Sequence, residues 1–269
     1  MRRANSVRLA TLNTWKNEGD LRRRLPAIVS GLRALAPDVV LLQEVFRADA
    51  LAWHTAQALA DPLGLSWVYA PARRKRRDWD GSTLMCESGL ALLWRGTIAA
   101  SERLPLPGPG EGEERIALLA AGEIRGLRVQ VGNVHLSHLR GDDAGRRAQL
   151  AAVLAYAGWQ KEADLRVVGG DCNATLDSPV FVPPVPGPWR LHDVFAGRPP
   201  CPPTFPLPPE PGRRGRTIDF LFALTGPDGV PPDVEHAGLA LAEPDEGGHW
   251  PSDHAAVTAD LCVSSASIA

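Results

Sequence analysis

The chain has 269 residues, with 29 Lys and Arg side chains against 31 Asp and Glu, a formal net charge of −2 at pH 7. This balance gives no global field that would attract nucleic acid or an anionic membrane, so an anionic partner has to be met by local groups. The four cysteines form no CxxC pair, which argues against a zinc ribbon or a disulfide framework. No apolar stretch reaches about 18 residues, so we expect a soluble cytoplasmic protein without stable membrane insertion.

Short apolar runs along the whole chain predict strands, with few helices between them. The first helix is expected over 21–35, where apolar side chains recur at spacings of three and four before Pro37 blocks continuation. A second helix is expected over 143–162. Because strands outnumber helices, the pattern favours two packed sheets with helices outside. The expected strands are 7–13, 38–45, 88–95, 127–137, 165–171 and 217–224.

Three segments rich in proline and glycine, 104–114, 179–189 and 198–216, cannot sustain ladders or helices and are expected to be surface loops. The first two are interpreted as connectors. The third ends directly at the segment TIDF, so it is either a connector or one wall of a site.

Polar side chains gather at or near the ends of the predicted strands. A core strand gains nothing from burying such groups, because an unpaired carboxylate in the interior costs several kcal/mol. Each one alone has an ordinary interpretation as a turn former, a surface acid or a hydrogen-bonded histidine. As a set, hard carboxylate and amide oxygens suit Mg²⁺ or Mn²⁺, and the absence of a compact His/Cys cluster in the sequence disfavours zinc. The set comprises Asn13, Glu44, Asn133, His135, Asp171, Asn173, Asp219, Asp253 and His254.

These residues lie in an ordered series of motifs, LATLNTW, VVLLQEV, SGLALL, VGNVHLS, VVGGDCNAT, TIDFLF and PSDHAAV. The series resembles the endonuclease/exonuclease/phosphatase superfamily over residues 7–262, so we expect one such domain over 1–269. The resemblance implies a four-layer α/β sandwich, in which two mixed β-sheets are flanked by helices as in DNase I. It also implies divalent-metal-dependent hydrolysis of a phosphate ester at one edge of the sandwich.

The same resemblance assigns metal-binding and water-activating roles. Glu44 is implied as the main metal carboxylate, with Asn13 adjacent and Asp253 a further contributor, and the metal as Mg²⁺ or Mn²⁺. Asp171 is implied to orient or deprotonate the attacking water while Asn173 supports the phosphate. In extended backbone, residues two apart face the same side, so both would address the phosphate while Cys172 points away.

The remaining site residues are also assigned by the resemblance. His254 is implied to pair with Asp219, whose carboxylate would favour the charged imidazole. His135 is implied as a second phosphate-binding histidine with Glu87 as its carboxylate partner. Arg115 is either a phosphate contact or an exposed loop arginine.

The substrate is predicted less specifically than the reaction. The segment ARRKRRDWD, 72–80, is the only dense basic cluster, either a solvated loop or a contact to a polyanion with Trp79 stacking on a base. Nucleic acid is therefore the favoured substrate of a monomeric nuclease or DNA-end phosphodiesterase. Alternatives are a sphingomyelinase-like enzyme, an inositol-phosphate phosphatase and an inactive module that binds phosphate ligands. The segment TLMCES lacks the tyrosine of abasic-site endonucleases.

Overall fold

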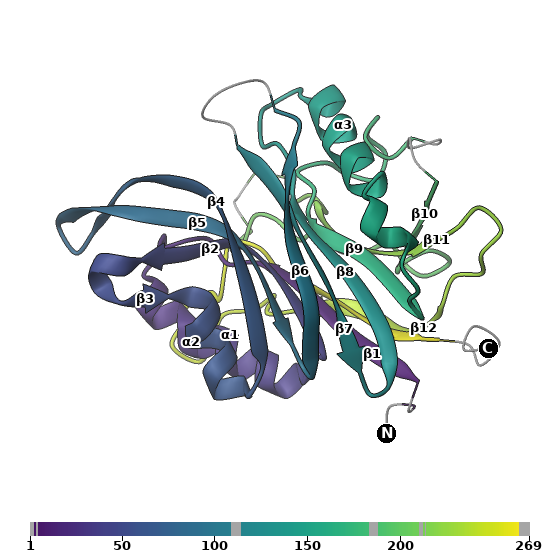
Figure 1. The fold of residues 1–269 in the computed structure, drawn as a ribbon. Coiled ribbons are helices and arrows are strands. Elements are labelled where there is room, and N and C mark those ends of the chain that lie inside the picture. The colour runs from purple at the N-terminus through teal and green to yellow at the C-terminus, as the bar shows by residue number, and fades with distance from the viewer. Residues whose placement is uncertain are drawn as a thin grey trace.

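A computed structural model describes residues 3, 5–108, 114–182, 188–209, 212 and 214–263. Two β-sheets face each other, and helices cover their outer faces (Figure 1). Each sheet is mixed, because β1 and β2 pair in parallel in one, β8 and β9 pair in parallel in the other, and the remaining pairs are antiparallel. The predicted four-layer α/β sandwich is confirmed.

The first sheet, called sheet A, has seven strands within the described residues. Strand β4 lies at one edge, and its hairpin with β5 projects beyond the body of the sandwich (Figure 1). In spatial order the strands are β12 (Asp233–Ala240), β13 (Ala256–Cys262), β1 (Ser6–Asn13), β2 (Val39–Ala48), β5 (Ser82–Trp94) and β4 (Ser66–Trp79), and β3 (Trp53–His54) pairs with β2.

The second sheet, called sheet B, has six strands in the described part of the chain. Its order places the two parallel strands, β8 and β9, at the centre, with antiparallel neighbours on both sides. In spatial order the strands are β10 (Arg190–Asp193), β11 (Asp219–Thr225), β9 (Leu165–Asp171), β8 (Leu127–His135), β7 (Arg115–Ile124) and β6 (Thr97–Leu106).

Helices α1 (Leu21–Leu35) and α2 (Thr55–Leu63) cover sheet A, and α3 (Asp143–Leu154) covers sheet B. Helix α1 is the crossover between the parallel strands β1 and β2, and it ends where Ala36 adopts a left-handed conformation ahead of Pro37. Two short 3₁₀ turns, Asp49–Leu51 and Ala157–Gln160, complete the helical segments described.

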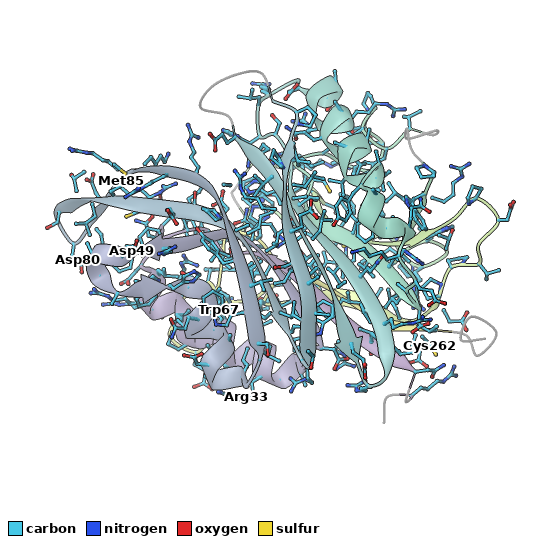
Figure 2. All side chains as sticks on the ribbon, viewed as in Figure 1. Arg33, Asp49, Trp67, Asp80, Met85 and Cys262 are labelled. Atoms are coloured by element: carbon cyan, nitrogen blue, oxygen red, sulfur yellow. The ribbon has the colours of Figure 1, made fainter. Side chains whose placement is uncertain are left out.

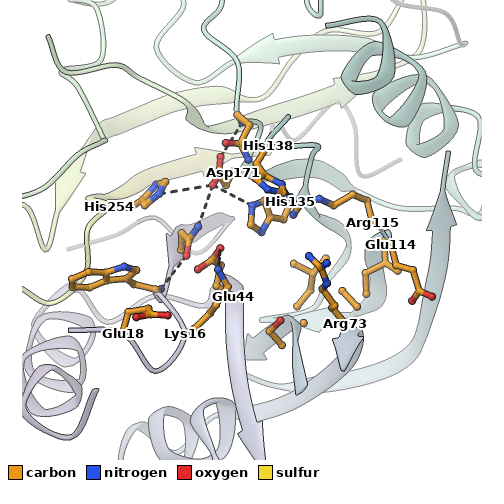
Figure 3. A pocket seen from close by; sticks show the side chains of 18 of the residues that line it. Lys16, Glu18, Glu44, Arg73, Glu114, Arg115, His135, His138, Asp171 and His254 are labelled. Carbon is orange, nitrogen blue, oxygen red and sulfur yellow. Dashed lines mark hydrogen bonds and ion pairs between the residues drawn. The ribbon is translucent and has the colours of Figure 1, made fainter. Parts of the chain in front are cut away.

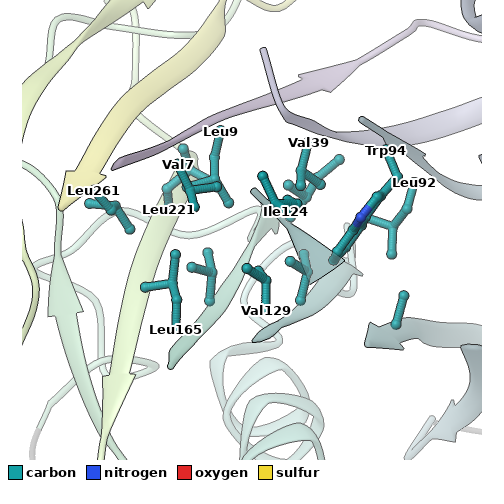
Figure 4. Close-up of a cluster of buried hydrophobic side chains, with 14 of the residues drawn as sticks. Val7, Leu9, Val39, Leu92, Trp94, Ile124, Val129, Leu165, Leu221 and Leu261 are labelled. Carbon is teal, nitrogen blue, oxygen red and sulfur yellow. The ribbon is translucent and has the colours of Figure 1, made fainter. Parts of the chain in front are cut away.

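The main hydrophobic core lies between the two sheets (Figure 4). Alternate side chains of each strand point inward, so β1 contributes Val7 and Leu9 while β5 contributes Leu92 and Trp94, all buried. A second cluster packs α3 on sheet B and a third packs α1 and α2 on sheet A. The three clusters fix the sandwich and leave one edge free for polar side chains.

Most of the predicted elements are confirmed. The helix expected over 143–162 is wrong in its second half, because the backbone leaves the helical region at Tyr156 and only a 3₁₀ turn follows. The loop expected over 104–114 is wrong at its start, since 104–106 belong to β6, and 109–113 lie outside the described residues. In the second loop 183–187 also lie outside, and in the third 210, 211 and 213 do.

Candidate active site

The polar strand ends meet at one edge of the sandwich, around a cavity of about 350 Å³ (Figure 3). The carboxyl ends of the parallel strands β1, β8 and β9 lie there, beside the amino end of the antiparallel strand β11. Predicted site residues that line the cavity are Asn13, Glu44, Arg115, His135, Asp171, Asn173, Asp253 and His254. Thus Asn13 and His254, which are 241 positions apart in the sequence, share one cleft.

Two consecutive glycines, Gly169 and Gly170, bring Asp171 into the cleft. Gly170 has φ +136°, and a Cβ atom there would lie 2.0 Å from the carbonyl oxygen of Val134. At Gly169 a Cβ atom would lie 2.6 Å from the carbonyl oxygen of Phe220. Neighbouring strands therefore approach β9 more closely than a side chain would permit, which explains the GG of this motif.

Glu44 reaches the cleft from an irregularity in β2. The pairing of β2 with β5 shifts register between Leu42 and Val45, and Glu44 has φ +55°. Asn133 of sheet B occupies the gap: its Nδ2 donates to the carbonyl oxygens of Leu42 and Ala91, both at 2.9 Å. Its Oδ1 accepts from Nε2 of Gln43 at 2.7 Å. Asn133 thus holds the two sheets together beneath the bulge that carries Glu44.

Asp171 is the centre of the site, and its side chain points at three others. Its Oδ2 accepts a hydrogen bond from Asn13 Nδ2 at 3.1 Å and lies 3.5 Å from His135 Nε2 and 3.9 Å from His254 Nε2. Its Oδ1 accepts from the backbone N–H of Asn173 at 2.9 Å. Asp171 is only 2% exposed at the floor of the cavity.

Asn173 reaches the cavity by a route other than the predicted one. Strand β9 ends at Asp171, and Asn173 has φ +50°, so the backbone between them is not extended. Its Nδ2 donates to the carbonyl oxygen of Leu136 at 3.2 Å. Asn173 faces the cleft because the Asp171 carboxylate closes a turn, while Cys172 is buried in the core beneath α3.

His254 is held from behind by Asp219. Its Nδ1 lies 2.9 Å from Asp219 Oδ2, and Thr204 Oγ1 donates to the same oxygen at 2.6 Å. Asp219 is fully buried and does not reach the cavity, so it acts through the imidazole. The loop 198–216 supplies Thr204 and also Phe205, whose ring is tilted against that of His254 with centroids 4.6 Å apart, so this loop does form a wall of the site.

Burial and charge set the protonation states. Burial opposes the charged form of His254, but the contacting Asp219 and then Asp171 raise its pKa to about 10. Burial, followed by the positive charges of Arg115 and Lys16, lowers the pKa of His135 well below its usual value. Burial and then Asp219 raise the pKa of Asp171 to about 7. At neutral pH the imidazole of His254 is therefore charged and that of His135 is neutral, while the Asp171 carboxyl group between them is close to its pKa and can take up or release a proton.

Three oxygen-bearing residues, Asn13, Glu44 and Asp253, could hold a divalent cation on one side of the cleft. Burial raises the pKa of Asp253; His254 opposes this, and the negative charge of Glu44 raises it further. The Glu44 Oε1 atom faces a cation already, because Lys16 Nζ lies 2.6 Å away. Hard oxygen donors with mutual repulsion suit Mg²⁺ or Mn²⁺.

Asp171, Asp219 and His254 also have ligand atoms within 4.8 Å of one another. Asp219 Oδ2 is engaged by His254 and Thr204, and although Oδ1 has no hydrogen-bond partner among the described residues, Asp219 lies outside the cavity. We therefore interpret this trio as a carboxylate beside a hydrogen-bonded His–Asp pair, and place the candidate metal site at Glu44.

On the opposite side of the cleft, Arg115 begins β7 and His138 follows β8 (Figure 3). Arg115 Nη2 lies 2.5 Å from His138 Nδ1, so the arginine is part of the cavity wall and not an exposed loop residue. With His135 and Asn173 it offers N–H donors for the oxygens of an anion.

Two predictions made from the sequence are wrong. Glu87 does not lie beside His135. Its neighbour in β5, Ser88, lines the cavity, so the Glu87 side chain points to the other face of the strand and pairs with Arg47 at 3.4 Å. Trp79 is not available to stack on a base, since it is buried and stacks on Phe46 with ring centroids 5.3 Å apart.

Sequence reasoning missed Arg24, which organises the loops around the cleft. Although α1 is amphipathic, this arginine is 2% exposed and donates to carbonyl oxygens of Thr14, Trp15, Lys16, Glu18 and Pro251. Burial lowers its pKa to about 10, still charged at neutral pH. The spacing held a signal that was missed: Arg24 lies three residues after Leu21 and four before Ile28, on the buried face of α1.

The sequence model of the Endonuclease/Exonuclease/phosphatase family matches residues 10–254, almost the whole strand series and every residue of the cleft named above. This chain belongs to that family. Its members are hydrolases that act on phosphoester bonds, and they generally use divalent metals. No curated protein matches the sequence.

Solved structures of the family share the fold at low identity. The human Nocturnin catalytic domain with bound sulfate superimposes with a TM-score of 0.72 at 20% identity, covering 97% of this chain and 95% of that one. Truncated TDP2 from Caenorhabditis elegans gives 0.71 at 20% identity, covering 96% and 97%. TDP2 from D. rerio complexed with single strand DNA product gives 0.68 at 20% identity, covering 95% and 98%.

Proposed function

We propose that this protein is a divalent-metal-dependent phosphodiesterase and that its substrate is a nucleic acid. The observation that carries the proposal is the arrangement around Asp171, whose Oδ2 faces Asn13, His135 and His254 at the floor of the cleft. Family membership supports the phosphoester chemistry. The single-stranded DNA product printed for the D. rerio TDP2 structure, together with the cations lining this cleft, supports nucleic acid as substrate.

Mg²⁺ or Mn²⁺, held by Asn13, Glu44 and Asp253, would neutralise negative charge on a nonbridging phosphate oxygen. Asp171 orients a water and takes its proton as the water oxygen bonds to phosphorus. The bond between phosphorus and the leaving oxygen breaks, and that oxygen takes up a proton from solvent. A phosphodiester then yields a phosphomonoester and an alcohol.

The other side chains of the cleft bind the phosphate. The charged imidazole of His254, kept in place by Asp219, and the amide of Asn173 donate to phosphate oxygens that gain charge in the transition state. His135 and Arg115 add donors from the sheet B side. Positioning and charge neutralisation account for most of the catalysis in such a site.

Competing substrates are less well matched. None of the described helices is long and apolar enough to span a membrane, and the tip of the β4–β5 hairpin carries Asp78 and Asp80, so the structure offers little to a sphingomyelin bilayer. An inositol phosphate remains a second candidate, because the cleft is cationic on one wall.

A substrate panel tests the proposal. Single- and double-stranded DNA, RNA, abasic DNA, 5′-tyrosyl DNA, sphingomyelin and inositol phosphates are incubated with Mg²⁺, Mn²⁺ or EDTA. We expect metal-dependent release of product from nucleic acid. Turnover of lipid or inositol phosphate alone would overturn the substrate assignment, and metal-dependent binding without turnover of any substrate would identify an inactive binding module.

A further inference from the structure

The basic cluster of the sequence lies in strand β4, not in a loop, and the strand divides it into two faces. Arg73, Lys75 and Arg77 line the cleft, whereas Arg74 and Arg76 do not. Cross-strand partners share a face, and the partner of Lys75 is the buried Cys86 while that of Arg76 is the exposed Met85. Figure 2 shows Met85 on the projecting hairpin.

Arg77 is built into the wall of the cleft. Its side chain is 10% exposed, and its Nε has no hydrogen-bond partner among the described residues. Two carboxylates of the cleft act on it: Glu44 has the larger electrostatic effect, and Glu18 Oε1 lies 3.8 Å from its Nη1. The Nε atom is shielded from solvent, so the guanidinium would meet an anionic oxygen in the cavity through its terminal nitrogens.

The cations of this face repel one another. The pKa of Lys75 is lowered, first by Arg77, then by burial and by Arg73. Holding like charges side by side raises the electrostatic free energy of the folded protein unless an anion lies among them. A row of phosphates along β4 would relieve that repulsion.

The length of the row indicates how many phosphates it meets. Same-face residues in an antiparallel strand are about 6.8 Å apart, so the row from Arg73 to Arg77 spans about 14 Å. Three cations at this spacing can each meet a separate phosphate of a backbone that runs along the strand. A compact phosphodiester of one or two units would leave most of the row unused.

We propose that Arg73, Lys75 and Arg77 bind the phosphates that flank the scissile one, so that the enzyme prefers a single-stranded oligonucleotide to a small phosphodiester. This inference rests on the proposed phosphodiesterase function. A single strand fits because Asp171 and His254 lie recessed, 2% and 4% exposed, at the floor beside a single row of cations. Cationic grooves that track one backbone are typical of single-strand binding.

The test compares two double variants that remove the same charge from the same strand. Arg73→Ala with Lys75→Ala removes two cleft-facing cations, and Arg74→Ala with Arg76→Ala removes two from the opposite face. The kcat/KM of each is measured for bis-p-nitrophenyl phosphate and for single-stranded DNA and RNA of about ten nucleotides, which is within single-strand site sizes. A duplex of the same sequence is a further arm.

For the cleft-facing variant, we expect the ratio of kcat/KM on the oligonucleotide to kcat/KM on bis-p-nitrophenyl phosphate to fall about 25-fold at about 0.1 M salt. The slope of log kcat/KM against log salt should weaken by about 1.4, at about 0.7 per phosphate contact. The opposite-face variant should keep the wild-type ratio and slope.

The outcomes separate this inference from the proposed function. If wild type cleaves both substrates but the two double variants behave alike, the row on β4 does not bind substrate. If the cleft-facing variant loses duplex cleavage more than single-strand cleavage, the single-strand assignment is wrong. If wild type cleaves neither substrate with Mg²⁺ or Mn²⁺, the proposed function itself fails.

Discussion

Replacing Asn133 with alanine removes the polar contact that joins the two sheets below Glu44. In the wild type the Asn133 side chain makes three hydrogen bonds of 2.7–2.9 Å and is fully buried. The variant leaves the buried carbonyl oxygens of Leu42 and Ala91 without these donors, at about 1–3 kcal/mol each. With the lost Gln43 contact, we expect the free energy of unfolding to fall by about 3–5 kcal/mol.

Urea unfolding followed by fluorescence measures this change, and an unchanged m-value confirms that stability alone is affected. The control is Gln130→Ala on the same strand, whose amide donates over 3.2 and 3.4 Å to the carbonyl oxygens of Gly158 and Lys161. We expect this control to lose about 1 kcal/mol. A loss for Asn133→Ala no larger than for Gln130→Ala would refute the account of the bulge.

Three further predictions concern other parts of the fold. In Arg24→Lys the shorter side chain cannot reach the carbonyl oxygens that Arg24 bonds in the loops bearing Lys16 and Pro251. We expect kcat/KM to fall at least about tenfold, a cost typical of misplaced catalytic groups. The control is Arg33→Lys, because Arg33 is exposed on the same helix. Gly170→Ala would place a Cβ 2.0 Å from the Val134 carbonyl oxygen, so we expect a melting temperature many degrees lower, and an unchanged value would contradict the close approach of β8 and β9. Burial, followed by the positive charge of Arg47, lowers the pKa of His54 from 6.5 to about 4. The neutral imidazole therefore makes its full contribution to stability above pH 6.5, and this contribution is lost as the pH falls through 4. In urea titrations at several pH values we expect about 2 kcal/mol of acid destabilisation for the wild type, which His54→Phe lacks.

Much of the site could be predicted because most of its residues occupy strand ends, although Glu44 lies at a bulge within β2. An apolar run followed by a carboxylate or imidazole marks the edge of a sheet, and the family motifs ordered those edges. That reasoning located Asp171, His254 and Glu44, which the structure brings into one cleft.

What the sequence did not predict depends on backbone conformation or long-range packing. The turn at Asn173 and the bulge at Glu44 both use positive φ at residues other than glycine, which no periodicity signals. Arg24 is buried by the adjoining segment 14–18 together with Pro251, which is 227 positions away. Glu87 was misplaced because one position along a strand reverses the face that a side chain occupies.

If Asp171 takes the proton of the attacking water, its carboxylate is required for metal-dependent hydrolysis of a phosphodiester. The most direct test is the kcat of wild type and Asp171→Asn on bis-p-nitrophenyl phosphate with Mn²⁺, and again after EDTA. The amide keeps the size of the side chain but cannot take a proton, so the account predicts a fall in kcat of about 10²–10⁴ and no wild-type activity in EDTA. Equal kcat in the two proteins, or wild-type turnover that persists in EDTA, would contradict it.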